Sequence, residues 1–165
     1  MASTYTPIAT TTTSGNATSV TFSSISSSYT DLVMVCNAKF SGNRTTMNLT
    51  FNSDTGNNYS YTQLYANGTT VGTGLVSTYG VGYAGLISDQ WQTVLLNFLS
   101  YSSTSFYKTA LVRGNNLGST ASEDVSATIN LWRNTSAINS IKLAPANGLY
   151  LIDGSVFTLY GITAA

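Results

Sequence analysis

Hydrophobic and polar residues alternate with a period of two along most of the chain, and the period of an amphipathic helix is not found. Residues 46–51 are typical, because Met47, Leu49 and Phe51 fall on one face and Thr46 and Asn48 on the other. Successive side chains of a strand point to opposite faces, so each such run predicts a strand with a buried side. The predicted strands are 19–25, 32–40, 46–51, 59–66, 91–99, 106–113, 125–132, 138–143 and 156–162.

Turn signals separate these strands. Residues 52–58 are rich in Asn and Gly, and Asn67-Gly68 is a hairpin signal. Short antiparallel strands at this spacing imply a β-sandwich, a jelly roll or a barrel. We expect an all-β fold, an antiparallel, jelly-roll-like β-sandwich of about nine strands. Strand 32–40 has apolar residues on both faces, which predicts a central strand covered on both sides.

Two segments depart from this pattern. Residues 1–17 are rich in Thr and Ser without alternation, and they are interpreted as an extended N-terminal arm ahead of a single sandwich domain at 18–165. Residues 69–85 are interrupted by five glycines, and this segment is either a weak, irregular edge strand or a long loop.

Charged residues are scarce, at 7% of the chain against about 25% in ordinary soluble domains. Six acidic and six basic side chains give a net charge of zero, and 23 serines, 26 threonines and 15 asparagines supply most polar groups. The basic residues are scattered, whereas nucleic-acid binding needs a concentrated positive face. Eleven tyrosines, six phenylalanines and two tryptophans argue against disorder. We therefore expect a folded domain that does not bind nucleic acid.

No membrane partner is expected. Residues 1–7 have neither the basic start nor the apolar run of a secretory signal, and no apolar stretch approaches the ~20 residues that cross a bilayer. The single cysteine, Cys36, lies in an apolar run and is predicted to be a buried, inert thiol. We expect the chain to be made and folded in a reducing cytoplasm.

Catalytic chemistry is mostly excluded by the residues that the chain lacks. Without histidine there is no Ser-His-Asp or Cys-His arrangement, and one cysteine cannot form a thiolate cluster. A glycosidase needs only two carboxylates, but Glu123 and Asp124 are adjacent and would point to opposite faces of a strand. Asn52, Asp54 and Asn57 could offer oxygen ligands to calcium, yet one carboxylate is too few and a plain turn is favoured. The sequence predicts no enzyme, no catalytic residues, no metal and no cofactor.

Aromatic residues give the one hint of a binding site. Tyr59, Tyr61 and Tyr65 share a face of their predicted strand and form a candidate glycan platform. The alternative is that these tyrosines pack across strands on a half-buried face. Trp91 and Trp132 stand at strand ends and are interpreted as core or interface anchors without a ligand.

Several segments resemble small virion structural proteins of tailed bacteriophages, including those of cyanophages and other marine phages. The resemblance lies in YTPIATT (5–11), SVTFSSI (19–25), YTDLV (29–33), LTFN (49–52), DTGNNYSY (54–61), LWRNTSAI (131–138) and FTLYGI (157–162). It spans nearly the whole chain, except the glycine-rich region 69–89 and residues 114–124. These motifs are structural signatures and name no reaction.

The resemblance implies a non-enzymatic component of the virion, made in the host cytoplasm. It favours a capsid decoration or cement protein that binds the major capsid protein or other virion proteins. The alternative is a tail-fibre or tail-associated module that binds a receptor or carbohydrate. On the first interpretation Tyr5, Pro7 and Ile8 belong to an interface arm that adds a strand to a neighbour. Strand edges poor in Lys and Glu further predict a closed homo-oligomer, a trimer.

Overall fold

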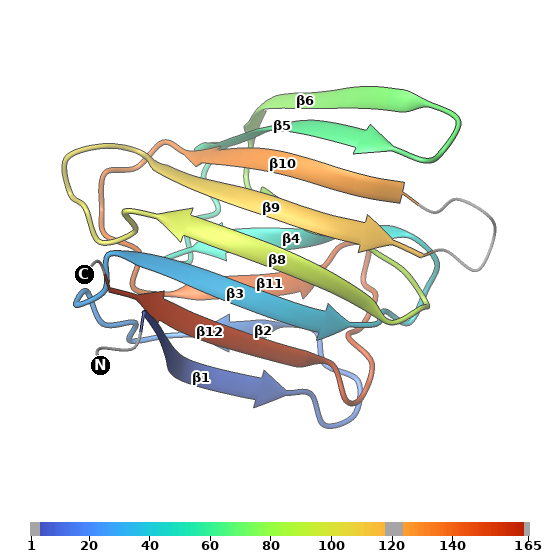
Figure 1. Ribbon diagram of the computed structural model, residues 1–165, viewed down its shortest axis with the longest axis horizontal. Helices are drawn as coiled ribbons and strands as arrows, with labels where there is room; N and C mark the ends of the chain where they lie inside the picture. The colour runs from blue at the N-terminus through green and yellow to red at the C-terminus, as the bar shows by residue number, and fades with distance from the viewer. Residues whose placement is uncertain (1–3, 118–123, 164–165) are drawn as a thin grey trace.

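The computed structural model describes residues 4–117 and 124–163, and within these ranges the chain forms twelve strands (Figure 1). The described residues include no helix of the length and apolar character that crosses a membrane. The strands are β1 (Tyr5–Thr12), β2 (Val20–Phe22), β3 (Asp31–Ala38), β4 (Thr45–Phe51), β5 (Tyr59–Ala66), β6 (Val71–Tyr79), β7 (Gly82–Ile87), β8 (Gln92–Leu99), β9 (Lys108–Asn116), β10 (Asp124–Trp132), β11 (Ile141–Pro145) and β12 (Val156–Ile162).

The strands form two antiparallel sheets packed face to face. The larger sheet has the order β1-β12-β3-β8-β9-β10-β5-β6, and the smaller one has the order β2-β11-β4-β7. In Figure 1 the larger sheet faces the viewer, with β2, β11 and β4 behind it. The expected antiparallel β-sandwich is confirmed, and β3 is an interior strand of the larger sheet as predicted. Its predicted cover on both faces is incomplete, because on the outward face Val35 is half-buried and Asn37 is exposed.

Strand pairing is nested, as in a jelly roll. β2 pairs with β11, β3 with β8, β4 with β7 and β5 with β6. This is the pattern of one long antiparallel hairpin rolled into two sheets. The β9–β10 hairpin is inserted between β8 and β5, which widens the larger sheet. The β5–β6 hairpin consequently projects beyond the labelled strands of the smaller sheet (Figure 1).

All nine predicted strands are present, and the structure adds β1, β6 and β7. The glycine-rich region therefore contains an edge strand, which was one of the two alternatives, followed by a second strand. Gly72 and Gly74 lie on one face of β6. The Tyr65 ring covers Gly72, where a Cβ would lie 2.3 Å from the ring, whereas a Cβ on Gly74 would make an ordinary contact with Gln63. The alternation of β6 is carried by its other face, Val71, Thr73 and Leu75, which the intervening glycines obscure.

The predicted N-terminal arm is wrong for residues 5–12. These residues form β1, an edge strand that pairs with β12 from Tyr5 opposite Ile162 to Thr12 opposite Val156. A bulge at Ile8 interrupts the register, and Ile8 packs against the core. The threonines of β1, which obscure the strand in the sequence, suit the exposed side of an edge strand. Residues 1–3 lie outside the described residues.

An aromatic cluster occupies the core between the sheets. Trp132 lies 5.5 Å from Phe51 and 6.4 Å from Tyr59, measured between ring centroids, and Phe98 meets Phe51 edge-on at 5.7 Å. All four side chains are almost completely buried. Cys36 is also buried, as predicted, and burial raises the pKa of its thiol far above the usual range, so the thiol is inert at neutral pH.

We expect the stability of the fold to be flat across neutral pH and to fall in alkali. Burial raises the pKa of five side chains: Cys36, Tyr59, Tyr61, Tyr83 and Tyr101. The pKa of Tyr59 rises to about 12. A raised pKa contributes stability that is complete below the unfolded value and is lost as pH rises through the folded value. Burial lowers the pKa of Lys108, which acts in the opposite direction but is a single group.

Because the chain has no histidine, the free energy of unfolding should be constant between about pH 5 and pH 8 and decline above about pH 10. Urea denaturation followed by tryptophan fluorescence at pH 5 to 11 measures this profile. A change above about 1 kcal/mol between pH 5 and pH 8 would contradict the prediction.

Candidate functional site

The three tyrosines of the candidate glycan platform share a face of β5 but have different surroundings. Tyr59 is completely buried beneath Trp132, its partner in β10, and its hydroxyl accepts a hydrogen bond from the Phe51 N–H at 2.9 Å. Tyr65 lies over Gly72 of β6. Tyr61 lines a cleft beside β7, and Tyr65 lines a separate, shallower groove. The platform as predicted is therefore wrong for Tyr59, because this end of β5 lies over the smaller sheet and the other end projects beyond it.

A cleft of about 380 Å³ lies between the β5–β6 hairpin and the edge of the smaller sheet formed by β4 and β7. We call it the tyrosine cleft. Its ten lining residues carry no charge: Thr46, Asn48, Tyr61, Val76, Tyr79, Val81, Gly82, Tyr83, Ala146 and Asn147. Three aromatic rings and two amides thus meet at one opening.

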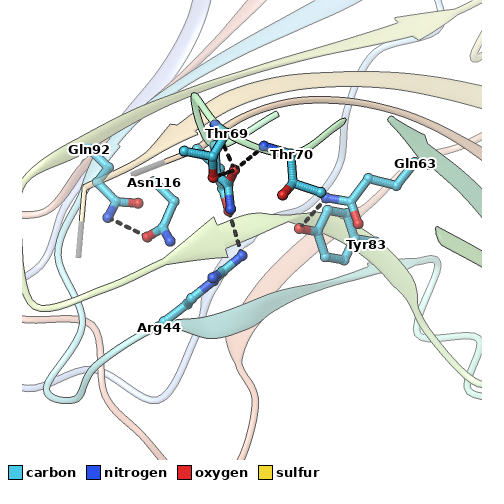
Figure 2. A network of polar contacts seen from close by, with 9 residues as sticks. Arg44, Gln63, Thr69, Thr70, Tyr83, Gln92 and Asn116 are labelled. Atoms are coloured by element: carbon cyan, nitrogen blue, oxygen red, sulfur yellow. Dashed lines mark hydrogen bonds and ion pairs between the residues drawn. The ribbon is translucent and has the colours of Figure 1, made fainter. Parts of the chain in front are cut away.

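The floor of the tyrosine cleft is held rigidly. Tyr83 is 3% exposed and stacks against Tyr61, with the ring centroids 5.0 Å apart. Its hydroxyl accepts a hydrogen bond from Gln63 at 3.0 Å, and its backbone N–H and C=O both bind the side chain of Asn130 at 2.7 and 2.9 Å. Figure 2 shows Gln63 turned toward Tyr83, with Arg44 nearby. Burial raises the pKa of Tyr83 well above its usual range, so the phenol is neutral.

Sequence reasoning missed most of this cleft. Tyr79 and Tyr83 fall in the region that the sequence left as an edge strand or a loop, so neither could be assigned to a face. A bulge adds to the difficulty: Tyr61 pairs with Val76 and Tyr59 with Tyr79, so β6 has one extra residue here. Val76 and Tyr79 are three apart, yet both line the cleft. Strict alternation would have placed them on opposite faces.

A second candidate surface is the outward side of β5, β6 and β10. On β10 the polar residues Thr128 and Asn130 are buried, whereas Val125 and Ile129 are 62% and 53% exposed. Apolar side chains continue across the sheet because Val125 is opposite Ala66, which is opposite Val71. We call this the outer apolar face. Its most exposed members are Leu64, Val71, Leu75, Val125 and Ile129.

A shallow groove of about 530 Å³ crosses the outer apolar face, and Arg113 is the one charged side chain among its lining residues. Exposed apolar patches of this kind mark surfaces that contact another protein or a membrane. The alternation of β10 is evident in the sequence, but the sequence does not show which of the two faces is buried.

The candidate arm residues belong to the edge strand β1. Tyr5 is 54% exposed and its ring meets Tyr160 edge-on at 6.4 Å. Pro7 is exposed and lies beside the bulge, where a residue without an N–H is tolerated. The three residues therefore belong to their own sheet, in which β1 is the outermost strand beside β12.

The carboxylate of Asp54, considered above as a calcium ligand, has a structural role. Asp54 accepts hydrogen bonds from Trp132 Nε1 at 2.7 Å, from Asn58 at 2.8 Å and from the Gly56 N–H at 2.8 Å. Burial acts to raise the pKa of Asp54, but these hydrogen bonds outweigh it and hold the pKa below its usual value. The turn thus uses its carboxylate internally, and no cluster of three or more potential metal ligands occurs among the described residues.

Of the two carboxylates considered for glycosidase chemistry, the structure describes one. Asp124 is buried and pairs with Arg44. Glu123 lies outside the described residues. Trp132 is a core residue, which was one of the two roles expected for the tryptophans, whereas Trp91 is 46% exposed and its role as an interface anchor stays a prediction.

We expect Asp54→Ala to destabilise the protein by about 2–3 kcal/mol, because it leaves the buried Trp132 N–H without an acceptor. Urea denaturation measures the difference. Thr55→Ala, an exposed change in the same turn, is the matched control and should have little effect. Equal stability of the two variants would show that the carboxylate does not hold the tryptophan.

Comparisons with models of protein families, with curated proteins and with solved structures found no match to this chain.

Proposed function

We propose that this protein is a non-enzymatic structural component of a phage virion, a capsid decoration or cement protein that binds the outer shell. The resemblance to phage virion proteins is the reason for proposing that the protein is part of a virion. The observation that carries the docking role is the outer apolar face, where Val71 and Leu75 are each 72% exposed. On β10, likewise, Val125 and Ile129 are exposed while Asn130 is buried, and a partner that covered this side would bury the apolar side chains as well.

The sheet edges support assembly as well. β6 forms one edge of the larger sheet with nine residues, none of them charged or proline. Unprotected edges of this kind pair readily with another chain unless a partner covers them. The opposite edge, β1, carries Pro7 and a bulge, which discourage pairing. β6 and the adjoining outer apolar face are therefore the surface that a neighbouring subunit would cover.

The partners on this proposal are other copies of the chain and the major capsid protein. A closed homo-oligomer, a trimer, would cover the β6 edges, and the remaining surface would contact the shell. Few contacts would depend on charge, so salt would weaken the assembly little. The protein would be made in the host cytoplasm and would function in the virion.

Val71→Lys combined with Leu75→Lys tests this role. Two lysines at the outer apolar face should weaken self-association and capsid loading roughly a hundredfold, because their charges would have to be desolvated in the interface. Sedimentation equilibrium measures the first effect, and co-sedimentation with capsids assembled without the protein measures the second.

Tyr150→Lys is the matched control, because Tyr150 is 42% exposed but lies between β11 and β12, away from this surface. The unfolding midpoint of all variants should stay close to that of the unmodified protein. A protein that is monomeric at micromolar concentration and does not load onto capsids would overturn the proposal. If the double variant loads onto capsids as well as the unmodified protein does, the outer apolar face is not the docking surface.

A further inference from the structure

We propose that the tyrosine cleft binds an uncharged saccharide, with a pyranose ring stacked on tyrosine and its hydroxyl groups bound by asparagine. This site is separate from the outer apolar face and does not depend on where the protein sits in a virion. The predicted glycan platform and this site share Tyr61, but here Tyr79 and Asn48 take the place of Tyr59 and Tyr65.

The size and charge of the cleft define the class of ligand. A volume of about 380 Å³ lies in the range of small-molecule sites, which begins near 300 Å³. None of the lining residues is Asp, Glu, Lys or Arg, and a charged ligand would lose its hydration without gaining a counter-charge from the lining. A neutral, polar molecule of the size of a short saccharide fits both conditions.

Unused hydrogen-bonding groups line the walls. Within the described part of the chain, the side chains of Thr46, Asn48, Tyr61 and Tyr79 make no hydrogen bond, although all four line the cleft. The Asn147 amide nitrogen donates a hydrogen bond to the Thr45 hydroxyl at 3.2 Å, which leaves the amide oxygen of Asn147 to accept one from a ligand. An amide has two donor hydrogens and an acceptor oxygen, so it can pair with a sugar hydroxyl, which both donates and accepts hydrogen bonds.

The aromatic groups supply the complementary apolar contact. The C–H face of a pyranose is apolar and packs on the face of an aromatic ring. Tyr61 is half-buried and fixed by its stacking on Tyr83, and Tyr79 is 55% exposed on the hairpin wall. Because Gln63 and Asn130 hold Tyr83 in place, little side-chain freedom would be lost on binding. The groove on the outer apolar face has Arg113 and few other polar side chains, so it could not satisfy the sugar hydroxyls.

Saccharide titrations of the full chain, followed by ligand-detected NMR, test the proposal. The probes are galactose, glucose, mannose and N-acetylglucosamine, with glucuronate as the charged comparison. At least one neutral sugar should bind with a dissociation constant on the order of 1 mM. Tyr79→Ala and Asn48→Ala should each weaken binding at least tenfold, and Tyr79→Phe, which keeps the ring, should retain more binding than Tyr79→Ala.

The matched control is Tyr107→Ala, which removes a 51% exposed tyrosine outside the cleft and should leave binding unchanged. Absence of binding by every neutral sugar at 20-fold the expected constant, roughly 20 mM, would overturn the proposal. Binding that survives in Tyr79→Ala, or a preference for glucuronate, would overturn it too. The Val71→Lys, Leu75→Lys protein should still bind the sugar, and Asn48→Ala, a change on β4 and outside the proposed docking surface, should still load onto capsids, so the two proposals fail separately.

Discussion

The burial of Trp132 determines which side of β10 faces the core. Its ring packs against Phe51 and Tyr59, and its indole N–H donates to Asp54 at 2.7 Å, so the side chain has one stable position. Because strand residues alternate, Asn130 and Thr128 must then point inward too. Asn130 is satisfied by the backbone of Tyr83, whereas the buried hydroxyl of Thr128 has no hydrogen-bond partner in the described part of the chain. Ile129 and Val125 are left outside.

The inserted β9–β10 hairpin has the second large effect. It separates β8 from β5 within the nested pairing of the jelly roll and so places the β5–β6 hairpin at the margin of the sandwich. One side of this hairpin forms a wall of the tyrosine cleft, and the other side carries Leu64, Val71 and Leu75 of the outer apolar face. Both candidate surfaces therefore arise from one feature of the topology, and they lie on opposite faces of the same strands.

The low charge of the chain is consistent with these surfaces. Hydroxyl and amide groups bind neutral partners without the desolvation that a charged group requires. The proposed docking face is apolar and the proposed saccharide site is polar and uncharged, so neither contact should respond strongly to salt or to pH near neutrality. A charged surface would keep strand edges apart, and here that protection is absent from β6.

The sequence by itself determined the fold class, the interior position of β3, the Asn67-Gly68 hairpin and the burial of Cys36, because local alternation, turn residues and apolar runs encode them. It did not identify β1, where threonines leave no alternation, and it did not decide between a strand and a loop for β6, where glycines interrupt the alternation. Which face of β10 is buried, and that Tyr59 lies in the core while Tyr61 borders a cleft, was decided by the tertiary structure alone. The physical reason is that a period of two defines two faces but does not say which one a second sheet covers.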